Sequence, residues 1–476
     1  MTTRVHSDLT DLSATELLAG FRERTVDPVE VLEAVLARIA RHEPTLNAFV
    51  HHDPDLARAQ AVAAAVRWAG GAPVGELDGV PLTLKENIAV AGLPVTAATA
   101  AQHDAPPRTV DGPVALTTAA AGAVRLGTTV MPDYGMLSSG VSSLHGVTRS
   151  PWNPAWTVGG SSAGASAAGA ARFGPLHVGS DIGGSIRLPA GWTGLASLKP
   201  TYGTVPVDPP YLGRAIGPLA RSIDDVALAM RVLTRPDPLD RDHTWIASSA
   251  PWESVTTTPL RDDEVAGMRV AVHADAGSGI GTDPEVAGTV RAVAAVFERA
   301  GAAVEELPPF VTPDLLARLD LFLRLRSHVD LSALAEDRRE RVLPYIREWA
   351  GAAAGLGGAE AFGAYSGVQE LRATTAAATR PYDVVLSPVA PVAAFPAEQH
   401  GPTDDPVTAL DHIAFTAPYN VSDQPAATVN AGFTADGRPV GVQLAGRRFA
   451  DVDVLRVARW YEHARPGAAR PTWPLG

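Results

Sequence analysis

The first 70 residues show the hydrophobic spacing of amphipathic helices. From residue 14 to about residue 41, apolar residues recur at intervals of three and four, and the pattern is interrupted at Asp27 and Pro28. That spacing predicts two helices, each with one apolar face. Residues 55–68 are rich in alanine and predict a third helix. Together these segments predict a helical layer over residues 1–70.

Patterns typical of strands begin after this layer. Residues 79–88 alternate like a strand, and residues 113–131 predict a helix that gives way to a short strand in the last four residues. Farther along, strands are predicted at 268–272 and 303–305, with a helix at 283–300 between them. A strand, a helix and a second strand in this order form the crossover unit of α/β proteins. The predicted fold class is therefore α/β.

The length of the chain allows several domains, but its composition favours one. Hydrophobic residues make up 46% and charged residues 19% of the 476 positions. No long tract of Ser, Pro or Gln and no run of like charge separates two blocks. We therefore expect a single domain over residues 1–476. Within it, the helical layer is followed by a core at 71–225 and by a C-terminal part at 226–476.

Net charge and residue usage exclude several classes of function. The formal net charge is −13, which disfavours a nucleic-acid or anionic-membrane partner because such proteins present basic surfaces. The N-terminus lacks the apolar segment of a signal peptide, and no apolar run approaches the ~20 residues of a membrane span, so we expect a cytoplasmic protein. Without cysteine, disulfides, thiolate metal sites and cysteine nucleophiles are excluded. The 13 histidines show no metal-binding spacing, so neither a metal nor another cofactor is expected.

The use of basic residues singles out one lysine. The chain has 39 basic residues but only two lysines, Lys85 and Lys199. Unlike arginine, lysine loses its proton readily when it is buried, and it can then act as a base. Lys85 lies in GVPLTLKENI at residues 79–88, where a strand would carry it into the interior. We therefore predict that Lys85 is a catalytic base and that Lys199 is structural.

Two glycine-rich motifs each carry a candidate catalytic serine. They are GGSSAGAS at residues 159–166 and GSDIGGSIRLPA at 179–190, with Ser161 and Ser185 24 residues apart. Glycine lets the backbone turn sharply and present successive N–H groups, as an oxyanion hole requires. A serine hydroxyl needs a base within hydrogen-bond reach, and no histidine accompanies either motif. Lys85 is the candidate base, relayed through the second serine.

These motifs resemble those of the amidase signature family of serine hydrolases. That family carries patterns similar to Gly-Val-Pro-x-x-x-Lys-Asp-Asn, Gly-Gly-Ser-Ser-Gly-Gly and Asp-x-Gly-Gly-Ser-Ile-Arg-x-Pro, and the likeness here extends to both flanks of the chain. The resemblance implies a single large domain with a central mixed β-sheet that helices cover on both faces. It also implies hydrolysis of a carboxylic acid amide through an acyl-enzyme.

The resemblance assigns a role to each matching residue. It implies that Lys85 is the base, that Ser161 is the bridging serine after a cis peptide bond with Gly160, and that Ser185 is the nucleophile. The backbone amides that it implies for the oxyanion hole are those of Ile182, Gly183, Gly184 and Ser185.

The pattern also predicts how substrate is bound. By resemblance, three residues face the acyl site, and a tryptophan adds apolar bulk near the nucleophile; these residues are Gly135, Met136, Leu137 and Trp192. Such a lining favours neutral substrates with an apolar acyl or aryl part. Asp181 and Arg187 predict an ion pair that braces the nucleophile loop, with Arg187 binding a substrate carboxylate as the alternative.

Two other functions use parts of the same pattern. An amidotransferase subunit of this fold would pass ammonia to a protein partner, and the serine motifs do not distinguish it from a hydrolase. Residues 160–164 also match the Gly-x-Ser-x-Gly motif of α/β-hydrolase esterases, with Ser162 as nucleophile. That motif follows a buried strand, whereas residues 150–156 contain two prolines and predict a loop.

The expected partner is therefore a small-molecule amide, and a homodimer is one assembly that the sequence allows. Residues 351–363 are rich in Gly and Ala, and they leave a helical segment and a lid open as alternatives.

Overall fold

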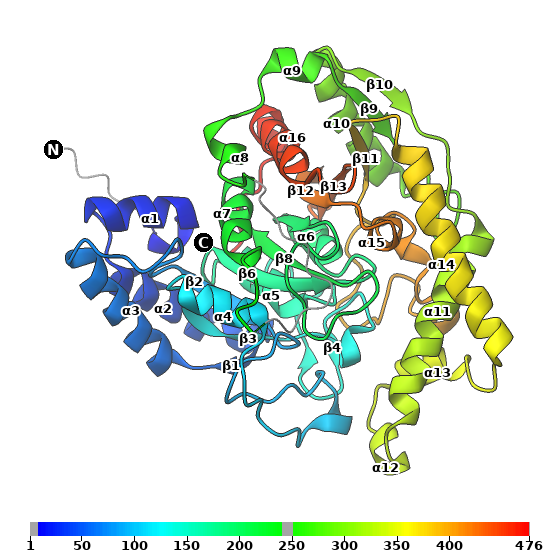
Figure 1. The fold of residues 1–476 in the computed structure, drawn as a ribbon, viewed down its shortest axis with the longest axis horizontal. Coiled ribbons are helices and arrows are strands. Elements are labelled where there is room, and N and C mark those ends of the chain that lie inside the picture. Colours follow the sequence, from blue (N-terminus) through cyan, green and yellow to red (C-terminus); the bar gives the residue numbers. More distant parts are fainter. Residues whose placement is uncertain (1–7, 240–250, 476) are drawn as a thin grey trace.

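A mixed β-sheet runs through the part of the chain that the computed structural model describes, residues 8–239 and 251–475 (Figure 1). Its strands are β1 (Phe49–His52), β2 (Pro81–Lys85), β3 (Val124–Thr129), β6 (Leu176–Asp181), β7 (Ala196–Lys199), β8 (Ala215–Ala220), β9 (Arg269–Val272), β10 (Ala303–Glu306), β11 (Val384–Pro388), β12 (Ala426–Phe433) and β13 (Pro439–Ala445). The strand order is β1-β3-β2-β6-β8-β7-β12-β13-β11-β9-β10. A separate short hairpin pairs β4 (Val141–Ser142) with β5 (Gly146–Val147).

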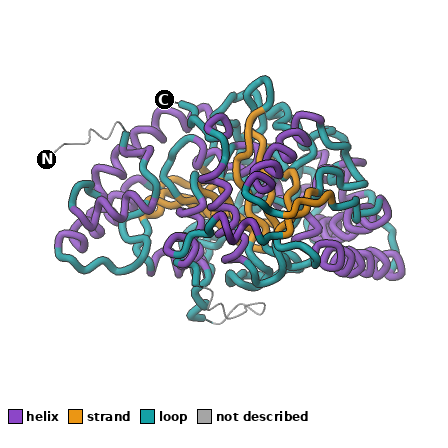
Figure 2. The backbone as a smooth tube through the Cα atoms, turned by 90° about the horizontal axis from the view of Figure 1, so that it is seen from above, coloured by secondary structure: helices purple, strands orange, loops and turns teal. Residues whose placement is uncertain are grey.

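Helices cover both faces of the sheet, so the strands lie inside the molecule (Figure 2). They are α1 (Ala14–Glu23), α2 (Pro28–Leu46), α3 (Pro54–Ala69), α4 (Pro113–Ala120), α5 (Ala163–Ala170), α6 (Arg187–Thr193), α7 (Ile223–Leu233), α8 (Ser254–Thr257), α9 (Asp262–Ala266), α10 (Pro284–Arg299), α11 (Pro313–Ser332), α12 (Glu336–Arg339), α13 (Pro344–Gly351), α14 (Gly358–Thr379), α15 (Ala417–Val421) and α16 (Asp451–Ala464). Figure 1 shows α1 to α3 at one end of the molecule and α11 to α14 at the other. The predicted architecture, a mixed sheet between two helical layers, is confirmed.

The two faces of the sheet carry different helices. Helices α4, α7, α10 and α16 share one apolar core with the strands, whereas α5 and α6 pack on the opposite face. Strand β2 divides its side chains between these faces, because successive residues of a strand point to opposite sides. Leu82 and Leu84 join the first core, and Lys85 points to the side of α5. Because the side chains of β2 alternate, Lys85 lies on the face of the sheet that α5 covers.

Local sequence signals explain where the N-terminal helices begin. Ser13 caps α1 and forms a capping box with Glu16. Asp27 caps α2 and Asp53 caps α3, and in both helices proline occupies the first turn. Such side chains accept hydrogen bonds from backbone N–H groups that a helix leaves without partners. The break predicted at Asp27 is thus confirmed.

The predicted crossover unit is confirmed as β9, α10 and β10. A different strand, β3, was predicted too late in the chain. Strand β3 covers Val124–Thr129 rather than residues 128–131. Beyond its end, the Val130 N–H donates to the carbonyl of Ala48 over 2.9 Å, and Pro132 has no N–H with which to continue a ladder.

Residues 351–363 form the end of α13, a turn and the beginning of α14. Helix is therefore confined to the two ends of this segment, and residues 352–357 connect them. Among the residues that the structure describes, no helix has both the length and the apolar character that crossing a membrane requires.

The sheet brings the predicted catalytic motifs to one edge. Strands β2 and β6 are parallel neighbours, so their carboxyl ends lie side by side. Lys85 is the last residue of β2, and Ser180 and Asp181 end β6. Helix α5 begins directly after Ser161 and Ser162, and Gly164 in its first turn lies against the end of β3, where its N–H donates to Val130 over 2.9 Å.

This close approach makes Gly164 a sensitive position. A Cβ atom there would overlap the carbonyl oxygen of Ala48 and would lie 2.5 Å from the backbone nitrogen of Val130. We expect Gly164→Ala to lower the free energy of unfolding by about 2–3 kcal/mol, because neither backbone segment can move without disturbing the sheet. The measurement is equilibrium unfolding in denaturant.

Gly288→Ala is the matched control. Gly288 is an exposed residue inside α10, and no atom lies within 4 Å of an added Cβ. The same substitution there should raise stability by about 0.5–1 kcal/mol. Equal effects at the two positions would mean that α5 does not pack against the strand ends as described.

Candidate active site

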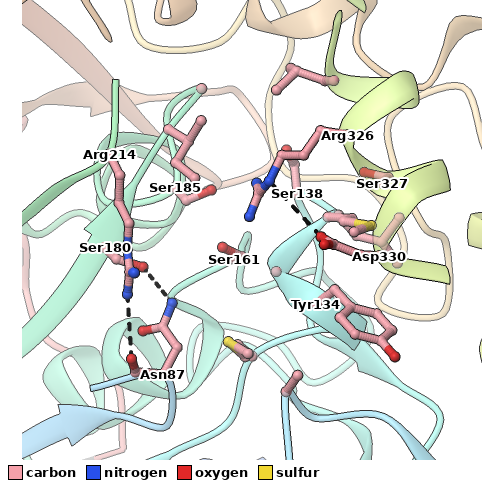
Figure 3. Close-up of a pocket in the computed structure, with 18 of the residues that line it drawn as sticks. Asn87, Tyr134, Ser138, Ser161, Ser180, Ser185, Arg214, Arg326, Ser327 and Asp330 are labelled. Atoms are coloured by element: carbon pink, nitrogen blue, oxygen red, sulfur yellow. Dashed lines mark hydrogen bonds and ion pairs between the residues drawn. The ribbon is translucent and has the colours of Figure 1, made fainter. Parts of the chain in front are cut away.

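A cavity of about 280 Å³ opens at the carboxyl ends of β2 and β6 (Figure 3). Residues 131–138 form one wall, and α11 contributes another through Leu323, Arg326, Ser327 and Asp330. Both glycine-rich motifs reach this cavity, and they contribute Ser161, Ile182, Gly183 and Ser185. The structure therefore brings together segments that are more than 150 residues apart in the sequence.

Lys85 is fully buried beneath the cavity and is surrounded by hydroxyl groups. Its Nζ donates to Ser161 Oγ over 2.8 Å, to Ser180 Oγ over 3.1 Å and to Ser162 Oγ over 3.2 Å. No carboxylate of the described residues lies within ion-pair distance of it. Burial, and next the positive charge of Arg214, lower the pKa of Lys85 to about 7. This lowered pKa makes the neutral form of Lys85 accessible near neutral pH.

Ser161 follows a cis peptide bond from Gly160, and its hydroxyl lies between Lys85 and the cavity. A side chain at residue 160 would overlap the backbone of Ser139, whose nitrogen would lie 2.7 Å from the added Cβ. Glycine is thus required where the chain passes this segment. The predicted cis bond is present in the structure.

Asp181 holds the loop that carries Ser185. Its carboxylate accepts hydrogen bonds from the N–H of Gly184 over 2.7 Å and from that of Ile186 over 3.1 Å. One of the four amides that we predicted for an oxyanion hole, Gly184, is therefore already bonded. Within the described chain, the three other amides have no acceptor; they belong to Ile182, Gly183 and Ser185.

The predicted ion pair of Asp181 and Arg187 is present and entirely buried. Arg187 reaches Asp181 through two nitrogens at 3.0 Å, and it also donates to Asn420 and Gln443 over 2.6 Å each. Burial alone would raise the pKa of Asp181, but the charge of Arg187 and these hydrogen bonds keep it well below its usual range. Arg187 does not line the cavity, so it is not placed to bind a substrate carboxylate.

The residues that we predicted to bind substrate divide into two groups. Gly135, Met136 and Leu137 line the cavity, as the sequence predicted. The prediction for Trp192 is wrong. This side chain is only 3% exposed, donates from Nε1 to the carbonyl of Val392 over 2.9 Å and packs edge-on against Phe395. It lies in the core because α6 turns its apolar face toward the C-terminal strands and away from the cavity.

The second lysine is also in the interior. The Lys199 Nζ donates to the carbonyl of Pro200 over 2.6 Å, and burial lowers the pKa of this lysine to about 8. Lys199 does not line the cavity, which agrees with the structural role predicted for it.

The sequence did not predict most of the residues that line the cavity, among them the polar residues Asn87, Ser180, Arg214, Arg326 and Asp330. The Asn87 amide donates to Ser180 Oγ over 2.9 Å, and Arg214 Nη2 donates to the carbonyl of Asn87 over 3.3 Å. Arg326 and Asp330 project from α11 on the opposite side (Figure 3). Asn87 and Ser180 adjoin the motifs, so their positions were accessible to sequence reasoning. The other three belong to no motif.

The chain is similar to one known protein family over most of its length. A family model described as "Amidase" matches residues 30–455. The chain belongs to the amidase signature family. Its predicted enzyme class, a hydrolase that acts on carbon–nitrogen bonds, is thereby confirmed.

Relatives within the amidase signature family span nearly the whole chain. An acylamidase of Rhodococcus erythropolis is 35% identical over 469 residues, which cover 96% of both proteins. A glutamyl-tRNA(Gln) amidotransferase subunit of Synechococcus sp. (strain CC9605) is 33% identical and covers 98% of this chain and 99% of its own length.

Solved structures agree with this assignment. A bacterial aryl acylamidase of the amidase signature enzymes superposes with a TM-score of 0.87 at 27% identity and covers 96% of each chain. A 6-aminohexanoate cyclic dimer hydrolase in complex with substrate gives a TM-score of 0.84 at 25% identity, with 98% of this chain and 99% of that chain covered.

The buried ion pair makes a prediction about stability. Arg187→Met would leave the Asp181 charge uncompensated in the interior, so we expect the free energy of unfolding to fall by about 3–5 kcal/mol. Arg261→Met is the control, because Arg261 and Asp263 form an exposed pair whose loss should cost about 1 kcal/mol or less. Equilibrium unfolding compares the two variants. A loss near the control's value would contradict the bracing role of Arg187.

Proposed function

We propose that this protein hydrolyses a carboxylic acid amide to the acid and ammonia or an amine, with Lys85, Ser161 and Ser185 as the catalytic residues. The observation that carries the proposal is the environment of Lys85. It is a buried lysine with no acidic partner among the described residues, and its Nζ lies 2.8 Å from the hydroxyl of Ser161. That hydroxyl lines the same cavity as Ser185.

Neutral Lys85 is the base of the first step. It accepts the proton of Ser161 Oγ as Ser161 accepts the proton of Ser185 Oγ, and the Ser185 oxygen then attacks the amide carbonyl carbon. A hydrogen bond of 3.1 Å from Ser162 N to Ser185 O holds the two serine loops together, which supports this relay. The pKa of about 7 supports Lys85 in this role, because a base must lose its proton near neutral pH.

Attack on the carbonyl carbon places negative charge on the carbonyl oxygen. Three unbonded amides, those of Ile182, Gly183 and Ser185, are suited to stabilise this oxyanion. Because the Asp181 carboxylate orients the loop through Gly184 and Ile186, these donors are already in place before substrate binds.

Collapse of the tetrahedral intermediate completes acylation. The proton that Lys85 holds returns through Ser161 to the amide nitrogen, the carbon–nitrogen bond breaks, and the acyl group remains on Ser185. Water then attacks the ester with the same relay as base, and the acid leaves. The steps require no cofactor.

An amidotransferase subunit is the second candidate function, because a relative named as such a subunit is 33% identical over 98% of this chain. Release of ammonia by the purified chain alone distinguishes the two. A hydrolase releases ammonia or amine from simple amides without another protein, whereas a subunit of that type requires its partner.

An esterase that uses Ser162 is disfavoured by the geometry. Ser162 is fully buried, and its Oγ lies between Lys85 and the backbone of Ser180 rather than in the cavity. The segment before α5 contains no strand of the sheet, so the strand-turn-helix arrangement of a nucleophile elbow is absent from this described region.

Covalent labelling identifies the nucleophile. A fluorophosphonate should modify Ser185, and peptide mass spectrometry should find the adduct there. Ser185→Ala should block labelling and lower kcat for an anilide by about ten-thousandfold or more, since no other hydroxyl can form the acyl-enzyme. An adduct on Ser162 with none on Ser185 would overturn the assignment.

The role of Lys85 is tested by charge-conserving replacement. Lys85→Arg should be as inactive as Lys85→Ala, with losses of about 10²- to 10⁴-fold in kcat/KM, because a guanidinium keeps its proton at any accessible pH. Ser161→Ala should retain more activity than either variant, since a water molecule can partly replace a relay.

The pH dependence of the wild-type enzyme provides a second test of Lys85. Only neutral lysine accepts a proton, so kcat/KM should rise with pH through an apparent pKa near 7, far below the ordinary lysine value of about 10.4. An active Lys85→Arg enzyme would contradict the assignment of Lys85 as the base. Lys85 would then have only a positioning role.

A further inference from the structure

Arg326 is the cationic side chain of α11 that faces the serine loops across the cavity. Figure 3 shows it projecting from the helix toward Ser185 and Ser138. Its guanidinium carbon lies 3.7 Å from the centre of the Tyr211 ring. Stacking of this kind holds the planar group in place while leaving its N–H edge free. The side chain is 33% exposed, so a ligand in the cavity can reach it.

No hydrogen bond joins Arg326 to another of the described residues. Its nearest acidic partner in the described chain is Asp330, whose oxygen lies 4.0 Å from Nε, beyond hydrogen-bond distance. The other two arginines of α11 are fully engaged. Arg318 pairs with carboxylates of Asp314 and Glu370, and Arg324 donates to Asp320 and to three backbone carbonyls. A guanidinium has five N–H donors, so the contrast marks Arg326 as a binding group rather than a structural one.

The balance of charge in the cavity favours an anion. Its lining carries three arginines and two carboxylates, which are Arg108, Arg214, Arg326, Asp208 and Asp330. Arg214 is held by the carbonyl oxygens of Pro209 and Asn87, at 2.9 and 3.3 Å. Its pKa of about 10 keeps it charged at neutral pH.

We propose that Arg326 binds a carboxylate of the substrate, so that the preferred substrates are amides that also carry a carboxylate group. The inference rests on the proposed function. A guanidinium and a carboxylate match in shape and form two parallel hydrogen bonds. Met136, Leu137, Leu323 and Ile413 line the same cavity and offer apolar contact to the carbon atoms between the two groups. The neutral substrates expected from the sequence would contact these apolar side chains but would offer Arg326 no carboxylate to hydrogen-bond.

Matched substrates test the proposal. One pair places the carboxylate on the acyl side, as glutaric acid monoanilide against pentananilide. The other pair places it on the leaving group, as 4-acetamidobenzoate against acetanilide. We expect wild-type kcat/KM to favour the carboxylate in one pair by roughly 10- to 100-fold, chiefly through KM. The pair in which the preference is found shows on which side of the scissile bond Arg326 acts.

Variants on α11 separate binding from structure. Arg326→Met should abolish the preference, because kcat/KM for the carboxylate substrate should fall much further than kcat/KM for its neutral counterpart, and Arg326→Lys should restore part of it. Arg318→Met, on the same helix but outside the cavity, is the control and should keep the full preference. An Arg326→Met enzyme with an unchanged preference would overturn the proposal, and so would a wild-type enzyme that favours neither carboxylate.

Binding distinguishes failure of this proposal from failure of the proposed function. Calorimetry measures the affinity of the same four compounds for Ser185→Ala and for Ser185→Ala/Arg326→Met, and it needs no turnover. Suppose that no anilide is hydrolysed, but that one carboxylate compound binds roughly 10-fold or more tightly than its neutral counterpart, and only when Arg326 is present. The hydrolase assignment then fails, and the anion site is supported. If the carboxylate compounds bind equally well to Ser185→Ala and to Ser185→Ala/Arg326→Met, the proposed anion site is overturned, but the proposed hydrolase function is not.

Discussion

The carboxylate of Asp181, buried at the end of β6, receives hydrogen bonds from Gly184, Ile186, Arg187 and Asn420 at 2.7 to 3.1 Å. An ionised group in the interior is tolerated only when donors and an opposite charge surround it. These bonds hold the following loop, which places Ile182, Gly183 and Ser185 at the cavity. Because Arg187 also binds Gln443 on β13, the C-terminal half of the sheet is tied to the same point.

The neighbouring strand β2 ends at Lys85, a buried group whose charged form is disfavoured, whereas the charged form of Asp181 is stabilised. Lys85 is as deeply buried as Asp181, but hydroxyl and carbonyl oxygens are its only bonded partners in the described chain. Asp181 is engaged with Arg187, and the charge of Arg214 further disfavours protonated Lys85. One interior thus holds a permanent ion pair and, one strand away, a lysine that gives up its proton near neutral pH. The arrangement of partners, rather than depth of burial, separates the charged carboxylate of Asp181 from a lysine whose pKa is lowered.

The floor and the walls of the cavity come from different parts of the chain. Residues 161–185 supply the serines and amides, whereas α11, more than 120 residues later, supplies Arg326 and Asp330. This separation lets the residues of the walls vary while the serines and amides stay in place. It is consistent with relatives of 25–35% identity that keep the fold and are named acylamidase, cyclic dimer hydrolase and amidotransferase subunit.

The sequence by itself determined the α/β class and the N-terminal helices, and it singled out Lys85, Ser161 and Ser185 as candidate catalytic residues, because local spacing, capping residues and glycine-rich motifs carry that information within short segments. It did not show that Gly184 is bonded to Asp181 or that Trp192 faces the core. The hydrogen bond of Gly184 spans only three residues, but it depends on how the loop after β6 turns, and Trp192 donates to the carbonyl of Val392, 200 residues away. Arg214 and Arg326 acquire their positions in the same way. Their surroundings are built from segments that only tertiary packing brings together, so no local pattern could reveal them.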